Sequence, residues 1–126
     1  MENLHIAGTD QSPEVTFNSN GVFSFTGIST PDHANKFYTP LFEWLKTFGE
    51  SNPKTVDFEL FIDYLNTSST RILVEMLILV NSFKNKGTNV TLRWKYEEDD
   101  DDIFEFGEEM EMVAGVEFDF IAVKVD

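Results

Sequence analysis

The chain has 126 residues and carries 23 Asp and Glu against 9 Lys and Arg, which gives a formal charge of −14 at pH 7. This charge excludes nucleic acid and anionic membranes as expected partners because both repel it, and the absence of cysteine excludes disulfides, thiolate metal sites and a cysteine nucleophile. No stretch is apolar enough to cross a membrane and no signal peptide opens the chain, so we expect one cytoplasmic domain over residues 1–126 whose partners are proteins or cations.

The first predicted elements form a β-hairpin. Apolar residues alternate with polar ones over residues 14–18 and 22–28, as in strands with one buried face. Ser19-Asn20-Gly21 between them is typical of a tight turn. The two segments are therefore expected to pair as antiparallel strands.

An amphipathic helix follows the hairpin. From Pro31 onward, apolar residues recur at steps of three and four, with Thr30-Pro31 as the expected cap. Pro40 lies inside this pattern and predicts either a kink or a new helix start capped by Thr39. The apolar stripe comprises Phe37, Leu41, Trp44, Leu45 and Phe48.

Three further strands are predicted after this helix. In the strand at residues 56–64, alternation places charged residues on one face, and a strand at 90–96 alternates in the same way. A less regular last strand covers residues 118–125. The expected core face of the first of these strands comprises Val56, Phe58, Leu60, Ile62 and Tyr64, and the opposite face comprises Asp57, Glu59, Phe61 and Asp63.

Two helices separate these strands, at residues 69–86 and 102–114, and Gly87 and Gly115 are their expected C-terminal stops. The core stripe of the second helix is Ile103, Phe106, Met110 and Val113. The element order predicts an α/β two-layer sandwich, with a mixed sheet, an N-terminal hairpin and about three helices mainly on one face.

Catalytic and metal-binding patterns are sparse. His5 and His33 stand alone without ligand spacing, and the sequence has no glycine-rich phosphate loop, so we predict no catalytic residue, metal site or cofactor. The acidic run at residues 97–102 offers carboxylates to a divalent cation, but it lacks the spacing of a calcium loop. We favour a solvated connection whose last acids stabilise the start of the following helix. Asp57, Glu59 and Asp63 are likewise expected to pair with Arg93 and Lys95 across strands rather than to bind metal.

The most informative segment lies where a strand ends and a helix begins. Residues 67–70 are four consecutive hydroxyl residues, whereas one Ser or Thr suffices as an N-cap. A helix N-terminus tolerates a phosphate, and Arg71 one turn on can add a charge-assisted hydrogen bond. The pattern is therefore compatible with phosphorylation of a hydroxyl at this helix start.

An apolar patch is expected beside these hydroxyls. The core stripe of the helix is Leu73, Met76, Leu77, Val80 and Phe83, which leaves Val74 and Ile78 outside it. Burying a phosphate in an interface without a charge partner costs more free energy than its interaction with the helix N-terminus contributes. Phosphorylation would therefore switch off binding to one partner at a nearly neutral surface.

These residues also carry a family resemblance. The chain resembles the SiaC-type regulatory phosphoproteins of bacteria over nearly its whole length. The matching segments are Tyr64-Leu65-Asn66-Thr67-Ser68-Ser69, Leu4-His5-Ile6, Gly8-Thr9, Ser12-Pro13, Phe37-Tyr38, Pro40, Trp44-Leu45 and Leu92-Arg93-Trp94-Lys95-Tyr96.

The resemblance implies a fold like the STAS domain and a function by partner switching. It implies a Ser/Thr kinase of the histidine-kinase-like ATPase fold and a PP2C-type phosphatase as partners. In the best-known branch the unphosphorylated protein activates a diguanylate cyclase, which raises cyclic di-GMP and promotes biofilm formation. The family's phosphoacceptor threonine falls on Thr67. Thr70, where an apolar residue is expected, and Pro31-Asp32-His33, where relatives tend to have Pro-Glu-Asn, depart from the family pattern.

The leading hypothesis is a non-enzymatic signalling protein switched by reversible phosphorylation of Thr67. Two alternatives stay open: a protein that binds a divalent cation or another ligand through residues 97–102, and an adaptor whose partner ignores phosphorylation. The candidate partner interface comprises Asn66, Ser68, Ser69, Arg71, Val74 and Ile78.

Overall fold

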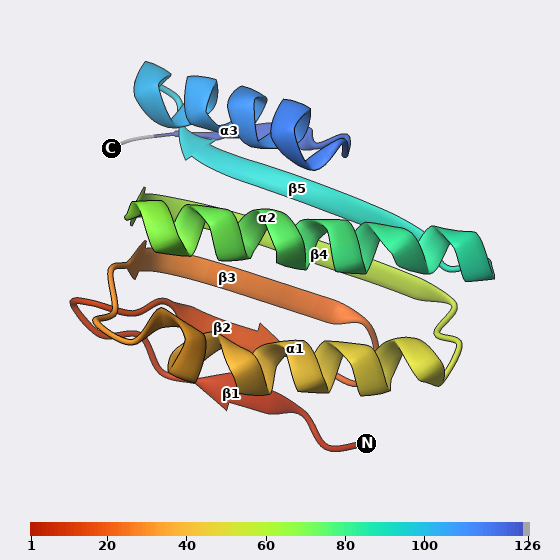
Figure 1. Ribbon diagram of the computed structural model, residues 1–126. Helices are drawn as coiled ribbons and strands as arrows, with labels where there is room; N and C mark the ends of the chain where they lie inside the picture. The colour runs from red at the N-terminus through yellow and green to blue at the C-terminus, as the bar shows by residue number, and fades with distance from the viewer. Residues whose placement is uncertain (125–126) are drawn as a thin grey trace.

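The computed structural model describes residues 1–124, in which one six-stranded sheet carries three α-helices (Figure 1). The elements in chain order are β1 (Leu4–Ile6), β2 (Glu14–Phe17), β3 (Val22–Ser29), α1 (Ala34–Glu50), β4 (Thr55–Leu65), α2 (Thr67–Ser82), the 3₁₀-helix η1 (Phe83–Lys86), β5 (Asn89–Glu97), α3 (Asp101–Ala114) and β6 (Asp119–Val123).

The strands lie in the sheet in the order of the sequence. β1, β2 and β3 pair antiparallel, and β3 to β6 pair parallel. Each parallel pair is joined through a helix, and right-handed crossovers that all advance in one direction place their helices on the same face. Figure 1 shows all three helices over one face of the sheet. The predicted two-layer sandwich with a mixed sheet and an N-terminal hairpin is therefore confirmed.

The core lies between the sheet and the helices and is rich in aromatic rings. Phe23 is in the centre of one aromatic group, with its ring centroid 4.9 Å from that of Phe17 and 5.6 Å from that of Trp44. Under α3, the buried Trp94 indole packs against Phe118 at 5.3 Å and donates a hydrogen bond from Nε1 to the carbonyl of Ile103 at 3.1 Å. Burial of rings on this scale is the main stabilising contribution of the fold.

A β-bulge near the end of β4 changes which face of the sheet its last residues occupy. Ile62 pairs with Gly27, but the next pair joins Tyr64 to Ile28, so Asp63 is an extra residue in β4. Because side chains alternate with a period of two, one extra residue reverses the facing of all that follow. The prediction that Tyr64 belongs to the core face is therefore wrong, since Tyr64 is 58% exposed and Leu65 is buried in its place.

Helix α1 begins later than predicted and is not divided. Its N-cap is His33, which makes no side-chain capping hydrogen bond, so Thr30-Pro31 is not the cap. Pro40 lies inside the helix, and neither a new start nor a Thr39 cap occurs there. Instead, Thr39 Oγ1 donates to the carbonyl of Asn35 at 2.6 Å within the same helix.

The other boundaries shift by small amounts. Strand β1, which has only three residues, is an additional strand that the sequence pattern does not predict. The last strand is shorter than predicted, and the predicted end at Val125 lies outside the described residues. Gly87 and Gly115 adopt positive φ angles of 92° and 68° at helix ends, as predicted for C-terminal stops.

The inner stripe of α3 also differs from the prediction. Met110 and Gly107 are buried, but Val113 is 66% exposed and does not belong to the core. Gly107 sits where α3 crosses the Trp94 indole, because a Cβ at this position would lie 2.5 Å from Nε1 of that ring. This close approach positions α3 on the sheet.

The sheet face without helices carries the predicted cross-strand ion pairs. Arg93 donates to Asp57, and Lys95 Nζ lies 3.3 Å from Glu59 Oε1. The hydrogen bond from Arg93 to Asp57 and the attraction between their charges raise the pKa of Arg93 above its usual value. These pairs confirm the prediction that Asp57 and Glu59 form ion pairs across strands.

No helix among residues 1–124 is long and apolar enough to cross a membrane.

Candidate functional site

Helix α2 starts directly after β4, at the edge of the sheet where the parallel strands end. Asn66 is its N-cap, with φ −75° and ψ 174°, and Asn66 Oδ1 accepts a hydrogen bond from the amide of Ser69 at 2.9 Å. The Asn66 amide donates to the carbonyl of Ser29 at 3.1 Å, which joins the start of α2 to the end of β3. The capping residue is therefore an asparagine and not one of the four hydroxyl residues.

Two of the four hydroxyl residues are engaged inside the protein. Ser69 is fully buried, and its Oγ lies 2.8 Å from Ser29 Oγ, which in turn lies 2.5 Å from the Tyr38 hydroxyl of α1. Thr70 Oγ1 donates to the carbonyl of Asn66 at 2.9 Å. Ser69 was predicted to be an interface residue, and this is wrong because its side chain is buried.

The three hydroxyls of Tyr38, Ser29 and Ser69 form a buried network that connects α1, β3 and α2. Burial raises the pKa of Tyr38 above its usual value of 10.0, and the hydrogen bonds from Ser29 and Ser69 oppose part of this rise. The phenol is therefore neutral at physiological pH. The network fixes the first turn of α2 against the rest of the core.

Thr67 and Ser68 differ from their neighbours because both are exposed. Within residues 1–124, neither hydroxyl has a hydrogen-bond partner in the protein. Thr67 is the first residue of α2, where backbone N–H groups have no partner inside the helix. A group attached to the Thr67 hydroxyl would thus lie in solvent near the positive end of the helix dipole.

Thr67 lines a hollow of about 530 Å³ on the side of α2 that faces α3. We call it the α3-side hollow; its lining residues are Tyr64, Leu65, Thr67, Thr70, Arg71, Val74, Glu75 and Val113. The predicted interface residues Arg71 and Val74 are both here. Arg71 makes no salt bridge within the part of the chain that the structure describes. It lies four residues after Thr67, on the same side of the helix.

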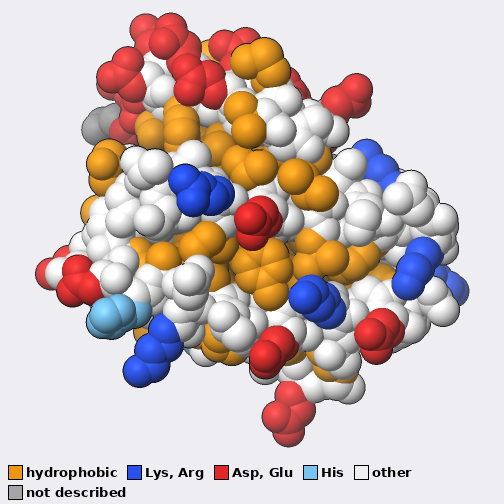
Figure 2. Space-filling model, in the orientation of Figure 1, with side chains coloured by type: hydrophobic (Ala, Val, Ile, Leu, Met, Phe, Trp, Pro, Cys, Tyr) orange, Lys and Arg blue, Asp and Glu red, His pale blue; other side chains and the backbone are white. Residues whose placement is uncertain are grey.

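Exposed apolar side chains surround the α3-side hollow. Ile78 of α2 is 48% exposed, as predicted, and Tyr64 and Val113 add larger exposed fractions. Figure 2 shows hydrophobic side chains along the boundary between α2 and α3. Neither Tyr64 nor Val113 was predicted to be exposed, because their periodicity in the sequence is that of core residues.

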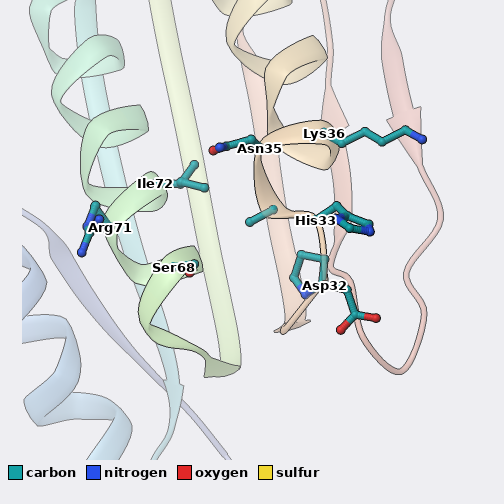
Figure 3. Close-up of a pocket in the computed structure, with 9 residues that line it drawn as sticks. Asp32, His33, Asn35, Lys36, Ser68, Arg71 and Ile72 are labelled. Atoms are coloured by element: carbon teal, nitrogen blue, oxygen red, sulfur yellow. The ribbon is translucent and has the colours of Figure 1, made fainter.

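A second hollow of about 710 Å³ lies on the opposite side of α2, toward α1. Ser68, Arg71 and Ile72 of α2 form one wall, and residues 31–36 form the other. In Figure 3, Asn35 and Ile72 point toward one another across this α1-side hollow, whereas Lys36 points away from α2. Thr67 and Ser68, although adjacent in sequence, therefore line hollows on opposite sides of α2.

The acidic run forms the connection between β5 and α3. Asp100 caps α3, with its Oδ1 accepting from the amide of Ile103 at 3.0 Å, and Asp101 and Asp102 occupy the first turn. This confirms the predicted role of the last acids at the helix start. Within residues 1–124, no group of three or more His, Cys, Asp or Glu side chains is arranged to hold a metal ion.

Comparisons with known proteins agree with the fold and with the resemblance in sequence. The model of the SiaC family regulatory phosphoproteins matches residues 6–123. A protein of Pseudomonas aeruginosa strain UCBPP-PA14, described as uncharacterized, is 29% identical over 110 residues, which cover 86% of this chain and 87% of that protein.

Solved structures of SiaC superpose over almost the whole chain. Apo-SiaC from Pseudomonas aeruginosa is 28% identical, with a TM-score of 0.84 over 97% of this chain and 98% of that chain. A crystal structure of the diguanylate cyclase SiaD in complex with its activator SiaC, from the same organism, matches with a TM-score of 0.86 at 27% identity, covering 97% of this chain and 99% of that chain. The likeness to the STAS domain stays a prediction. The chain belongs to the SiaC family of regulatory phosphoproteins.

Proposed function

We propose that the protein is a non-enzymatic switch whose choice of partner depends on reversible phosphorylation of Thr67. The observation that carries the proposal is the position of this hydroxyl, which is exposed and unpartnered at the first residue of α2 and lines a hollow bordered by exposed apolar side chains. A kinase can reach it, and a phosphate on it lies beside a surface suited to protein binding.

The surroundings of Thr67 stabilise a phosphate in solvent. The first backbone N–H groups of α2 and the Arg71 guanidinium, one turn further on, both favour negative charge at this place. A phosphate at a helix N-terminus gains about 0.3–1 kcal/mol when exposed. The phosphorylated state is therefore compatible with the folded structure.

The same phosphate opposes burial of the α3-side hollow by a partner. It brings roughly −1.5 to −2 charges, which have to lose water when an apolar surface covers them. It also competes for Arg71 and occupies space between Thr67 and Val74. A partner that packs on the unmodified hollow is therefore released when Thr67 is phosphorylated.

The proposed partners follow from the family and from its solved complex. SiaC of Pseudomonas aeruginosa is the activator of the diguanylate cyclase SiaD in that complex. We propose that this chain, in its unphosphorylated form, likewise activates a diguanylate cyclase, and that a kinase of the histidine-kinase-like ATPase fold and a PP2C-type phosphatase control it. The kinase needs ATP and the cyclase needs GTP, so the proposal places the protein in the cytoplasm.

Incubation with ATP and a Ser/Thr kinase of the histidine-kinase-like ATPase fold from the same organism tests the proposal. Mass spectrometry is expected to place one phosphate on Thr67, and Thr67→Ala is expected to abolish its incorporation. Ser68→Ala is the matched control, because Ser68 is also exposed but lines the other hollow. Phosphate confined to residues outside 67–70, or unchanged labelling of the Thr67→Ala protein, contradicts the proposal.

Binding to the cyclase separates the switch from a simple adaptor. Unmodified protein is expected to bind and stimulate the enzyme, and the phosphorylated protein is not. Thr67→Asp is expected to weaken binding only in part, because a carboxylate carries one charge and a shift from 99:1 to 1:99 requires about 5.5 kcal/mol of differential affinity. Equal binding of the modified and unmodified proteins supports an adaptor that ignores phosphorylation.

A further inference from the structure

The negative charge of this protein is concentrated in one segment. Residues 97–119 contain 12 Asp and Glu and no Lys or Arg, so the remaining residues carry 11 acids and 9 bases, a net charge of only −2 out of −14. This segment comprises α3, its two flanking connections, the last residue of β5 and the first residue of β6. Figure 2 shows the acidic side chains gathered over the start of α3. The charge is therefore a local property of α3 and the segments that flank it, and not an even background.

Helix α3 packs beside α2 and forms the second wall of the apolar surface described above. Val113 lines the α3-side hollow. Asp102 and Glu109 lie on the same stripe of α3 as Val113. They precede Val113 by 11 and 4 residues, which correspond to about three turns and one turn of an α-helix. Both carboxylates are exposed. An apolar strip between two helices is thus bordered by carboxylates along its α3 edge.

The α3-side hollow and the exposed side chains of Ile78, Tyr64 and Val113 together form what we call the α2–α3 groove. We propose that the α2–α3 groove binds a basic amphipathic helix of a partner protein. Apolar side chains of that helix would cover Ile78, Val113 and Tyr64, and its Lys or Arg residues would face the carboxylates of α3. Recognition of a helix in a groove takes this form, with apolar anchors at helical spacing and charge complementarity at the rim. The length of α3, 14 residues, matches a partner helix of about four turns.

Attraction by α3 and phosphorylation of Thr67 act on different steps of binding. Rim charges mainly change the association rate and its salt dependence, whereas groups buried in the interface change dissociation. A phosphate on Thr67 adds charge of the same sign as α3, so it does not repel a basic helix. It lies on the α2 side of the groove, where apolar side chains of the partner pack, so it releases the partner through the cost of burying a phosphate that no Lys or Arg of that partner pairs with. The charge of α3 decides which class of partner is attracted.

The groove proposal is tested with two synthetic peptides and unphosphorylated protein. Both peptides are amphipathic helices with leucines at positions i, i+3, i+4 and i+7; one carries lysines beside the leucine stripe and the other carries glutamates. We expect only the lysine peptide to bind by fluorescence anisotropy, with affinity falling at least about tenfold when salt rises from about 0.05 M to about 0.5 M. Backbone NMR shifts are expected to change along α2 and α3.

Matched variants separate the groove from general acidity. Asp102→Lys with Glu109→Lys on α3 is expected to weaken the lysine peptide about tenfold or more, whereas Glu43→Lys with Glu50→Lys on α1 makes the same charge change and is expected to alter affinity less than about twofold. Ile78→Ser is expected to weaken binding as well. Its control is Val22→Ser, because Val22 is 50% exposed, close to the 48% of Ile78, but lies on the sheet face without helices.

Several results overturn the groove proposal. These are no binding of the lysine peptide, equal binding of both peptides, equal losses from the α1 and α3 charge pairs, or NMR shifts confined to the opposite face of the sheet. The assay needs no kinase and no phosphate. Its failure therefore leaves the phosphorylation of Thr67 untouched, and a failed phosphorylation assay leaves the groove standing.

Discussion

The two sides of α2 show how one helix can be both anchored and open. Toward α1, the first turn is held by the buried hydroxyls of Ser69, Ser29 and Tyr38. Toward α3, the same turn borders exposed aliphatic side chains and a hollow, and the neighbouring helix carries only acidic charges. Thr67 lies at the start of the helix, between a side that provides rigidity and a side available to a partner.

This difference has a physical consequence for signalling. A phosphoacceptor on a loose loop would need ordering each time an enzyme or a partner bound it, which reduces affinity. Here, Asn66 and Ser69 hold the turn in place, so the proposed phosphate on Thr67 would lie at a fixed position relative to Val74 and Ile78. A modification of one side chain can therefore act directly on the adjoining groove.

The largest expected effect comes from loosening α3, which forms one wall of the groove. Gly107→Ala places a Cβ against the fully buried Trp94 indole, which has little room to move. Overpacking of this kind costs about 1–3 kcal/mol of the free energy of unfolding. Alanine returns at most about 1 kcal/mol through its helix propensity.

Urea unfolding measures this loss, and the exposed neighbouring change Glu108→Ala is the control, with an expected change within about 0.5 kcal/mol. If the Gly107→Ala protein is as stable as the parent, α3 does not depend on its close approach to the Trp94 indole.

A smaller effect is expected on the anchored side. Tyr38→Phe removes one hydroxyl from the buried network and is expected to lower the free energy of unfolding by about 1 kcal/mol at neutral pH. The pKa of Tyr38 is raised in the folded protein, so the folded state keeps its proton at a pH where the unfolded state releases it. This contribution to stability is complete below pH 10.0 and declines as pH rises through the folded pKa.

Unfolding curves of the parent and Tyr38→Phe proteins at neutral pH and above pH 10.0 test this sign. The difference in the free energy of unfolding between the two proteins is expected to become smaller in the alkaline range, because only the parent has this phenol. A gap that widens with pH contradicts a raised pKa for Tyr38.

The smallest effect on stability is expected at Thr67, the proposed phosphoacceptor. Asn66→Ala removes the N-cap of α2 and is expected to cost about 1 kcal/mol of the free energy of unfolding. Thr67→Ala is expected to change that free energy by less than about 0.5 kcal/mol, because Thr67 follows the cap and its side chain is exposed.

Thermal unfolding of both variants distinguishes the capping role from the signalling role. A large loss of stability in Thr67→Ala would mean that its hydroxyl supports the fold. The loss of phosphorylation in that variant would then no longer identify Thr67 as the modified residue.

Most of the fold was predictable because the hydrophobic pattern follows burial. The stripe in α1 and the alternation in β4 and β5 indicate one helix layer on one face of a sheet, and the structure confirms this. The family resemblance likewise depended on local motifs. The pattern did not predict the facing of Tyr64, because the extra residue Asp63 shifts the alternation of side chains by one position. It also did not predict β1, which is too short to show an alternation.

The candidate site was predictable only in part. Local chemistry identified the hydroxyl series and the exposed Ile78, but it does not distinguish the buried Ser69 from the exposed Thr67. That distinction depends on Ser29 and Tyr38, which are 40 and 31 residues away along the chain and meet Ser69 only after folding. Periodicity also placed Val113 in the core. The spacing of apolar residues shows which side of α3 is apolar, but it does not show how much of that side the sheet and α2 cover.

The sequence by itself determined the order of the elements, the layer that each apolar stripe faces and the local charge of residues 97–119, since these depend on neighbouring residues along the chain. Only the tertiary structure decided that α3 lies beside α2, that a bulge exposes Tyr64 and that Thr67 and Val113 line one hollow. These features depend on contacts between distant segments, and such contacts exist only once the sheet has brought the helices together.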